Sequence, residues 1–214
     1  AGYRAPSPIE QFVSTIQSGF QVVPNLSLTG ERAWSGEVGV TATLVNRVRV
    51  DGAVFGSYYS DLIAPGPAPG QPFVFQFQNV SRARIYGLDL GVNSQLIPNW
   101  LEAQLTYLYL NTLDLDTEKA LPYRSPHNLT ATVNVWRQRL GVDLRYRSRI
   151  LEVLAFPLDP RGDATVVDFR AAYSFFNVTW QMKVGNVFNT FYVDVQERIP
   201  SAPRSLTLTA VYGL

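Results

Sequence analysis

The sequence predicts an all-β fold of antiparallel, up-and-down strands that cross a membrane as part of a β-barrel. The composition is apolar, with 46% hydrophobic and only 16% charged residues among 214. No stretch approaches the roughly 20 apolar residues that a membrane-spanning helix needs. Instead, apolar and polar side chains alternate along most of the chain. Successive side chains in a strand point to opposite faces, so a wall between lipid and a polar lumen must alternate in this way.

The alternation delimits about nine strands in chain order, and a helical period is absent. The segment that begins at Leu140 shows the pattern most sharply. One register holds Leu140, Val142, Leu144 and Tyr146, and the other holds Asp143, Arg145, Arg147 and Arg149. The predicted strands are residues 34–44, 47–61, 86–92, 101–109, 129–136, 140–149, 166–175, 178–184 and 205–214.

A soluble antiparallel sandwich also alternates, so it is the main alternative fold. Two features favour the membrane. Several segments run for 10–15 residues, which is longer than the mode of about 5–6 for globular strands. In addition, the polar register carries many Arg, Asp and Glu residues, whereas the apolar register is almost free of charge.

Short and long connections alternate between the predicted strands. Short links are expected near Val45-Asn46, Pro98-Asn99, Gln138-Arg139 and Phe176-Asn177, and long ones at 60–80, 112–124, 151–164 and 190–203. Outer-membrane barrels have short periplasmic turns and long extracellular loops, so the C-terminus is predicted to be periplasmic. Residues 6–30 then form a further external loop, and residues 1–5 end an earlier strand. Girdle aromatics near the short turns are Trp100, Trp136 and Phe176.

Nine is an awkward number of strands for a closed barrel. Bacterial single-chain barrels normally have an even count, and an open sheet in lipid leaves two unpaired edges. Residues 1–214 are therefore predicted to be one partial barrel domain. It is expected either to be the distal part of a larger barrel or to pair with a partner chain.

Seven short motifs, in order along the chain, resemble those of TonB-dependent receptors. The first is Gly2-Tyr3-Arg4-Ala5-Pro6-Ser7 followed by Glu10, which is similar to "GFRAPS…E" in that family. The others are Pro24-Asn25-Leu26 with Glu31-Arg32 and Ser35–Gly39, Tyr58–Ile63, Asn79-Val80 with Ala83, Ile85 and Gly87–Asp89, Pro126-His127-Asn128, Val184–Asn189 with Tyr192, and Pro203-Arg204. The final residue, Leu214, departs from the aromatic end that is usual in the family.

The resemblance implies the C-terminal barrel portion of an outer-membrane receptor, with about 22 strands in the usual whole barrel. It also implies a plug domain in the lumen and energy from the TonB complex, which contacts an N-terminal segment. Neither the plug nor that segment has a counterpart in this sequence. The expected function is uptake of a scarce nutrient such as a ferric siderophore, cobalamin or a saccharide.

Candidate ligand-binding residues lie near the external mouth. The side chains of Arg145, Arg147 and Arg149 share the lumen-facing register, and guanidinium groups suit an anionic ligand. Alternatively, they form ion pairs in the lumen or contact a plug. Tyr59, at a loop edge, is positioned to stack on a ligand, whereas Tyr58 is expected in the aromatic girdle.

No catalytic residue, metal ligand or cofactor is predicted. The chain has no cysteine, which excludes disulfides and thiolate chemistry, and its net charge of +1 does not indicate a nucleic-acid partner. The single histidine, His127, lacks evident partners for a metal site or a catalytic triad, so a structural role is expected. The acidic run 114–118 lacks the glycine-bearing pattern of an EF-hand and is expected to be a solvated loop.

Two other function classes remain open from the sequence. An outer-membrane enzyme needs a compact acid, base or nucleophile group near the external loops, and ester or peptide hydrolysis that is lost in His127→Ala reveals it. A passive pore gives stable conductance in planar bilayers without any plug. The leading expectation is a receptor that is not an enzyme, in contact with outer-membrane lipid, the plug and the remaining strands.

Overall fold

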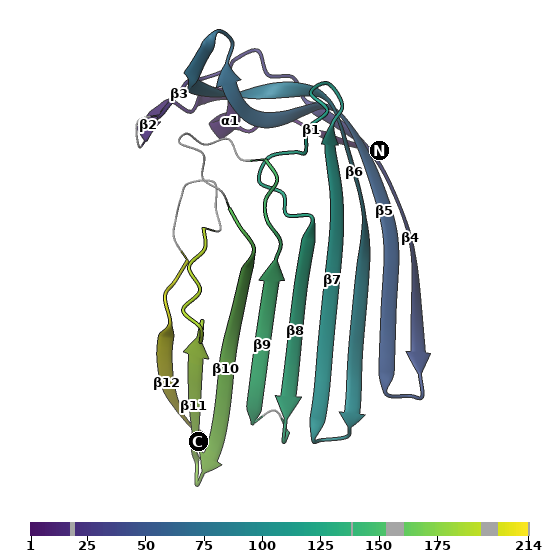
Figure 1. The fold of residues 1–214 in the computed structure, drawn as a ribbon, viewed down its shortest axis with the longest axis vertical. Helices are drawn as coiled ribbons and strands as arrows, with labels where there is room; N and C mark the ends of the chain where they lie inside the picture. Colours follow the sequence, from purple (N-terminus) through teal and green to yellow (C-terminus); the bar gives the residue numbers. More distant parts are fainter. Residues whose placement is uncertain (18–19, 138, 153–160, 194–200, 214) are drawn as a thin grey trace.

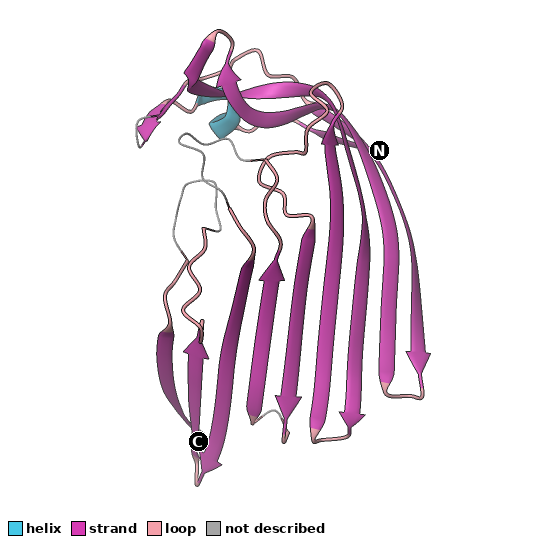
Figure 2. Cartoon of the chain, in the orientation of Figure 1, coloured by secondary structure: helices cyan, strands magenta, loops and turns pink. Residues whose placement is uncertain are grey.

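The computed structural model describes residues 1–17, 20–137, 139–152, 161–193 and 201–213. The described residues form one curved sheet in a single layer, shown in Figures 1 and 2. The sheet has twelve strands, and its main path runs β1-β4-β5-β6-β7-β8-β9-β10-β11-β12. Neighbours on this path are antiparallel. The single layer contradicts the sandwich alternative, which requires a second sheet packed on the first.

All nine predicted strands are present, as β4 to β12, with ends shifted by a few residues or more. The segment before them holds one short helix and three short strands. The elements are β1 (Gly2–Arg4), α1 (Pro8–Phe12), β2 (Thr15–Gln17), β3 (Phe20–Val22), β4 (Glu31–Leu44), β5 (Val48–Ala68), β6 (Gln71–Ile97), β7 (Leu101–Asp114), β8 (His127–Val135), β9 (Leu140–Arg147), β10 (Ala164–Phe175), β11 (Val178–Gly185) and β12 (Ser205–Tyr212).

The prediction of a long loop at 60–80 was wrong, because β5 and β6 continue through it as a paired hairpin. Its turn contains Gly70, which has φ +73°. Proline cannot donate to a ladder and suggests a loop, but here Pro65 and Pro67 pair with Phe77 and Phe75 of β6. Figure 1 shows this extension bending over the end of the sheet that carries the longer connections. We call that end the mouth.

The predicted loop at 6–30 contains α1 and the hairpin of β2 and β3. The sequence did not predict α1, which has only five residues, too few to show a helical period. Its start is set by a capping box between Ser7 and Glu10. Strand β3 lies parallel to β6, with Gln21 opposite Val74. This parallel pair is an exception to the antiparallel fold that the sequence predicts.

The four predicted short turns all lie at the end of the sheet opposite the mouth, together with the C-terminus (Figure 1). Val45 and Asn46 both have positive φ, near +50° and +55°, which matches the twist of a tight hairpin. Trp100, Trp136 and Phe176 are exposed at these turns, as expected. Gln138, Leu214, and residues 153–160 and 194–200 of the two predicted long loops lie outside the described residues.

The two faces of the sheet differ in charge, as the alternation predicts. Across β8, β9 and β10, Val133 lies beside Val142, which lies beside Phe169. We call the face that holds these residues the uncharged face and the opposite one the inner face. In the described residues, no helix is long and apolar enough to cross a membrane.

Candidate functional site: the inner face and the mouth

The inner face is divided into two walls of opposite charge. We call the inner face of β4–β7 the acidic wall and that of β8–β11 the basic wall. Below the mouth, the cross-strand registers place charged side chains of the acidic wall at Glu37, Arg49, Asp51, Asp89 and Glu102. The basic wall carries Asp143, Arg145, Arg147, Asp168, Arg170 and Lys183. Acids dominate the first wall, and bases dominate the second.

Arg170 links three strands of the basic wall. Its Nε and Nη2 donate to the two carboxylate oxygens of Asp143 at 2.7 and 3.1 Å, and Nη2 also reaches Asn134 Oδ1 at 3.2 Å. Thr132 donates to the same carboxylate at 2.9 Å. A forked guanidinium suits this arrangement because it offers several donors in one plane. The network fixes the register of β8, β9 and β10.

Gly141 leaves the room that this network needs. A Cβ atom at Gly141 would lie 2.9 Å from both Arg170 Nη2 and Asn134 Oδ1. Any side chain there therefore displaces the guanidinium from its position across the strand. The glycine is explained by this close approach, as is typical of glycines inside strands.

Asp168 is the most buried charge of the basic wall, with its side chain only 8% exposed. It lies directly opposite Asp143 in the register of β9 and β10, and like charges in that position repel. Three donors offset this repulsion. Arg145 Nη2 lies 3.1 Å away, Lys183 Nζ lies 3.6 Å away, and the backbone N–H of Asn186 donates at 2.8 Å.

The four predicted ligand-binding residues are not brought together. Arg145 is engaged with Asp168, and Arg147 donates to the carbonyl of Val193 at 3.0 Å. The Arg147 guanidinium also lies 5.6 Å from the centre of the Tyr192 ring. Arg145, Arg147 and Tyr192 line a common cavity of about 220 Å³. The two arginines therefore already have partners within the wall.

Arg149 and Tyr59 lie apart from this pair. The prediction that Arg149 shares a strand register with Arg145 was wrong, because β9 ends at Arg147. Arg149 instead lines a cavity of about 400 Å³ at the mouth with His127 and Tyr146. Tyr59 lies on the inner face of β5, opposite Ala83. Four strand spacings separate β5 from β9, or about 19 Å along the sheet.

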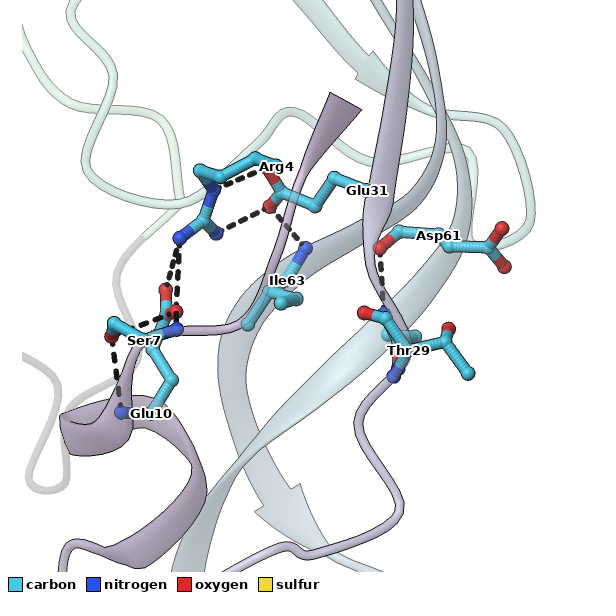
Figure 3. Close-up of polar contacts among 8 residues, drawn as sticks. Arg4, Ser7, Glu10, Thr29, Glu31, Asp61 and Ile63 are labelled. Carbon is cyan, nitrogen blue, oxygen red and sulfur yellow. Dashed lines mark hydrogen bonds and ion pairs between the residues drawn. The ribbon is translucent and has the colours of Figure 1, made fainter. Parts of the chain in front are cut away.

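At the mouth, Arg4 joins the start of the chain to the wall, as Figure 3 shows. Its guanidinium donates to both carboxylate oxygens of Glu31 at 2.6 and 2.7 Å, and Nη1 reaches Glu10 at 2.9 Å. Glu31 also accepts the backbone N–H of Ile63 at 2.6 Å. Arg4 and Glu10 belong to the first family-like motif and Glu31 to the second. The structure thus gives these motifs a physical role in anchoring α1 and β5.

A second contact holds the bend where β5 leaves the wall. Asp61 has φ +58°, a conformation that non-glycine residues adopt rarely. Its carbonyl accepts from the side-chain amide of Asn79 at 2.6 Å, and the same amide bonds both the N–H and the carbonyl of Thr29. Figure 3 labels Thr29 and Asp61, the two residues that this amide joins. The motifs at Tyr58–Ile63 and Asn79-Val80 therefore meet at one bend.

The electrostatics of Glu10 follow from its position at the start of α1. Partial burial alone would raise the pKa of this carboxyl. The ion pair with Arg4 and the hydrogen bonds from the N–H and hydroxyl of Ser7 outweigh burial and lower the pKa of Glu10 below its ordinary value. Folding therefore favours the charged carboxylate form of Glu10 over the protonated form.

The remaining sequence candidates have structural contacts. His127 lies on the uncharged face opposite Tyr109, and its Nδ1 is 2.8 Å from the hydroxyl of Tyr107. In the acidic run, the Asp114 carboxylate accepts the N–H of Asp116 and of Thr117, and the Asp116 carboxylate pairs with Arg82. Among the described residues, no group of three or more His, Asp and Glu is arranged to hold a metal ion.

Sequence reasoning missed the residues that hold the mouth together. Arg4, Glu10 and Glu31 entered only as parts of motifs, and Asn79 had no assigned role. One signal was present: Ser7, Pro8 and Glu10 follow the pattern of a helix start with a capping box. The pairing of Arg4 with Glu31 joins residues 27 positions apart, and no local pattern reports it.

A family model for "TonB dependent receptor-like, beta-barrel" matches residues 1–189. That match spans most of the chain and includes β1 to β11. The chain belongs to this family of TonB-dependent receptor barrels. The sheet is accordingly part of a transmembrane barrel, with the uncharged face outward and the inner face toward the lumen. No curated protein sequence matches the chain.

Solved structures of TonB-dependent receptors share this fold. The copper transporter OprC has a TM-score of 0.73 and 18% identity, over 95% of this chain and 34% of OprC. The pyoverdine outer membrane receptor FpvA from Pseudomonas aeruginosa PAO1, bound to pyoverdine, has a TM-score of 0.68 and 17% identity, over 89% of this chain and 31% of FpvA. The FrpB iron transporter from Neisseria meningitidis has a TM-score of 0.64 and 19% identity, over 89% and 31%.

OprC and FrpB are transporters and FpvA is an outer membrane receptor, and at identities of 17–19% the likeness concerns the fold. The chain spans about a third of the length of the solved receptors that it matches.

Proposed function

We propose that residues 1–214 form the C-terminal part of the barrel of an outer-membrane receptor that imports a scarce nutrient with energy from the TonB complex. The observation that supports this most is the two-faced single sheet of a family member, with an inner face divided into charged walls. The remaining strands, a plug domain in the lumen and an N-terminal TonB-contacting segment complete the proposed receptor. Its role is transport and not catalysis, and no nucleic acid is a partner.

The proposed orientation places the short turns and the C-terminus in the periplasm. Short turns lie together at one end of the sheet (Figure 1), and outer-membrane barrels have their short turns on the periplasmic side. The mouth, with α1, β2, β3 and the extension of β5 and β6, then faces the outside of the cell. A ligand meets these elements first.

The proposed ligand is a small anionic molecule or chelate, such as a ferric siderophore. The basic wall carries Arg145 and Arg147 near the mouth, and guanidinium groups bind carboxylates and phosphates well. Tyr59 and Arg149 are the other proposed contacts. Because Arg145 and Arg147 already have partners, ligand binding exchanges the partner of each arginine instead of filling an empty site. Cobalamin and saccharides are the other nutrient classes that the family fold suits.

Uptake in cells tests the proposal directly. The complete protein is expressed in a strain that lacks its own siderophore receptors, with and without a functional TonB. Accumulation of radiolabelled ferric siderophores, cobalamin and oligosaccharides is then measured. TonB-dependent accumulation of one class is expected. Equal accumulation without TonB indicates a passive pore, and ester or peptide hydrolysis lost in His127→Ala indicates an enzyme; either result contradicts the proposal.

The basic wall is tested in the same cells. Arg145→Gln combined with Arg147→Gln should weaken binding of an anionic ligand, measured on ice to suppress transport. The control is Arg49→Gln on the acidic wall, which removes a similar exposed guanidinium. An equal effect of both changes contradicts a specific role for the basic wall.

A further inference from the structure

Three arginines lie on the uncharged face, next to the mouth. Arg32 of β4 and Arg82 of β6 flank Ser60 of β5 in one cross-strand row. In the next row away from the mouth, Arg84 lies beside Tyr58, which lies beside Trp34. We call Arg32, Arg82 and Arg84 the outer arginine cluster. These three charged residues are an exception on a face that is otherwise almost free of charge.

The rows below the cluster define its depth in the membrane. The next row holds Tyr86 with Gly36 and Gly56, and the row after it holds Val38, Val54 and Leu88. At the far end of the same face the row is Leu44, Val48 and Ser94. The order from the mouth is therefore arginine, then aromatic, then aliphatic. Aromatic girdles mark the interface of a barrel with the bilayer, so the arginines lie at the level of the lipid headgroups.

The cluster has more positive charge than its own protein neighbours neutralise. Arg82 pairs with Asp116 at 3.2 Å, and both side chains are more than a third exposed. Arg84 lies 5.3 Å from the centre of the Tyr86 ring. Within the described ranges, neither Arg32 nor Arg84 has a carboxylate partner. All three arginine side chains belong to exposed residues.

Grouped like charges on an outward face repel each other unless an anion lies among them. A charged side chain facing hydrocarbon is costly at the bilayer centre and nearly free of cost at the interface. At that depth, the available anions are the phosphates of lipid headgroups. Arginine binds phosphate through two parallel N–H donors, which gives geometric specificity as well as charge neutralisation.

We propose that the outer arginine cluster binds the phosphorylated headgroup of a lipid in the outer leaflet, with Trp34, Tyr58 and Tyr86 against the adjoining part of that lipid. The proposal rests on the outward placement of the uncharged face and on the proposed orientation of the mouth toward the outside of the cell, and on no property of the transported ligand. The lipid site and the ligand path therefore lie on opposite faces of the same strands.

Native mass spectrometry of the complete protein in maltoside detergent tests the proposal, with diphosphoryl lipid A or phosphate-free lipid A added as the probe. The wild type should retain the diphosphoryl form preferentially. Arg32→Gln combined with Arg84→Gln should weaken that retention roughly 30-fold, because each basic residue near an anionic surface contributes about a fivefold factor. The matched control is Arg47→Gln combined with Arg137→Gln, which removes the same charge at the short turns and should retain the lipid as the wild type does.

Three results overturn the proposal. They are equal retention of the two lipids by the wild type, unchanged retention in the Arg32 and Arg84 variant, or an equal loss in the control variant. Inhibition of lipid retention by inorganic phosphate alone at low concentration would indicate a free-anion site instead. Folding is checked by heat-modifiable migration on gels. If the double variant does not fold, Arg84→Lys, which keeps the charge but loses the paired N–H donors, replaces it and should weaken retention of the diphosphoryl lipid. The comparison of the two lipids by the wild type needs no variant and still tests the proposal.

The outcome for transport is independent of this test. The variant of the outer cluster should retain ligand binding, and TonB-dependent uptake in cells, because its side chains face away from the lumen. Loss of lipid binding with normal ligand binding thus separates failure of the lipid site from failure of the proposed receptor function.

Discussion

The acidic wall and the basic wall differ in how their charged side chains are partnered. On the acidic wall, Glu37 and Asp89 have no side-chain partner in the described part of the chain. Arg49 pairs with Asp51 two residues away on its own strand, and the only side-chain bond that the described residues show from these two to another strand is from Thr41 to Asp51 at 2.6 Å. On the basic wall, Arg170 and Asp168 join neighbouring strands. Pairs across strands fix the register of a sheet, whereas a pair within one strand does not. The basic wall therefore uses its charges to join strands, whereas Glu37 and Asp89 of the acidic wall are left exposed.

The largest expected difference is between two aspartates. Asp168→Ala removes a side chain that is only 8% exposed and leaves Arg145 and Lys183 without their shared partner. We expect a loss of about 2–3 kcal/mol in the free energy of unfolding. Asp89→Ala on the acidic wall should change it by less than about 0.5 kcal/mol. Urea unfolding in lipid vesicles measures both, and equal losses would remove the distinction between the walls.

A smaller difference is expected between two arginines. Arg170→Gln breaks bonds to Asp143 and Asn134 on two other strands, and should cost about 1–2 kcal/mol of unfolding free energy. Arg49→Gln breaks an exposed pair, 61% and 34% exposed, and should cost about 0–0.5 kcal/mol. The same unfolding measurement applies. A larger loss in Arg49→Gln would show that the acidic wall is the more tightly coupled one.

The space above Gly141 provides a sharper test of the same network. Gly141→Ala places a methyl group against Arg170 and Asn134, so we expect about 1 kcal/mol of destabilisation from the lost bridge. In contrast, Gly36→Ala meets open space and should be neutral or slightly stabilising. A double-mutant cycle with Arg170→Gln distinguishes the causes, because the part of the Gly141→Ala cost that comes from displacing the guanidinium should disappear once it is absent, which leaves only the contact with Asn134.

The smallest effect is expected at the mouth, on acidification. The pKa of Glu10 is lowered by folding, so its contribution to stability is present above the ordinary pKa of 4.5 and is lost as the pH falls through the lowered value. The protection factors of the α1 backbone amides, which correct hydrogen exchange for its intrinsic pH dependence, should therefore fall at low pH in the wild type. Glu10→Gln should show lower protection factors at neutral pH and little further change on acidification. An identical pH dependence of the two would assign the effect to other groups.

The sequence predicted the strands well because their signal is local. Alternation from Leu140 to Arg147 is set by the two faces of one strand, so it survives without knowledge of any neighbour. The extension of β5 was missed because Pro65 and Pro67 usually end a ladder, and only pairing with β6 shows that they do not. The charged residues of the acidic and basic walls are visible in the sequence. Their division into two walls depends on the order of the strands in the sheet, which only the structure shows.

The ligand-binding residues were predicted less well, for a physical reason. Arg145, Arg147 and Arg149 look equivalent in a period of two, but their environments depend on where β9 ends and on the segment that follows β11. Tyr192 contacts Arg147 from 45 positions away, and Asp168 contacts Arg145 from another strand. Such contacts depend on the register between neighbouring strands and on where the loops fold back onto the sheet. The alternation within a single strand contains neither kind of information.

The bend at Asp61 has a mechanical consequence. Beyond it, the last seven residues of β5 extend from the wall over a length of about 23 Å. Rotation by about 10° at the bend displaces the tip by about 4 Å, given that length, while the barrel below keeps its shape. The side-chain amide of Asn79 donates to the carbonyl of Asp61 at the bend, and that of Asn25 donates to the carbonyl of Phe77 in the extension. The bend and these two contacts together set the angle at which the extension leaves the wall.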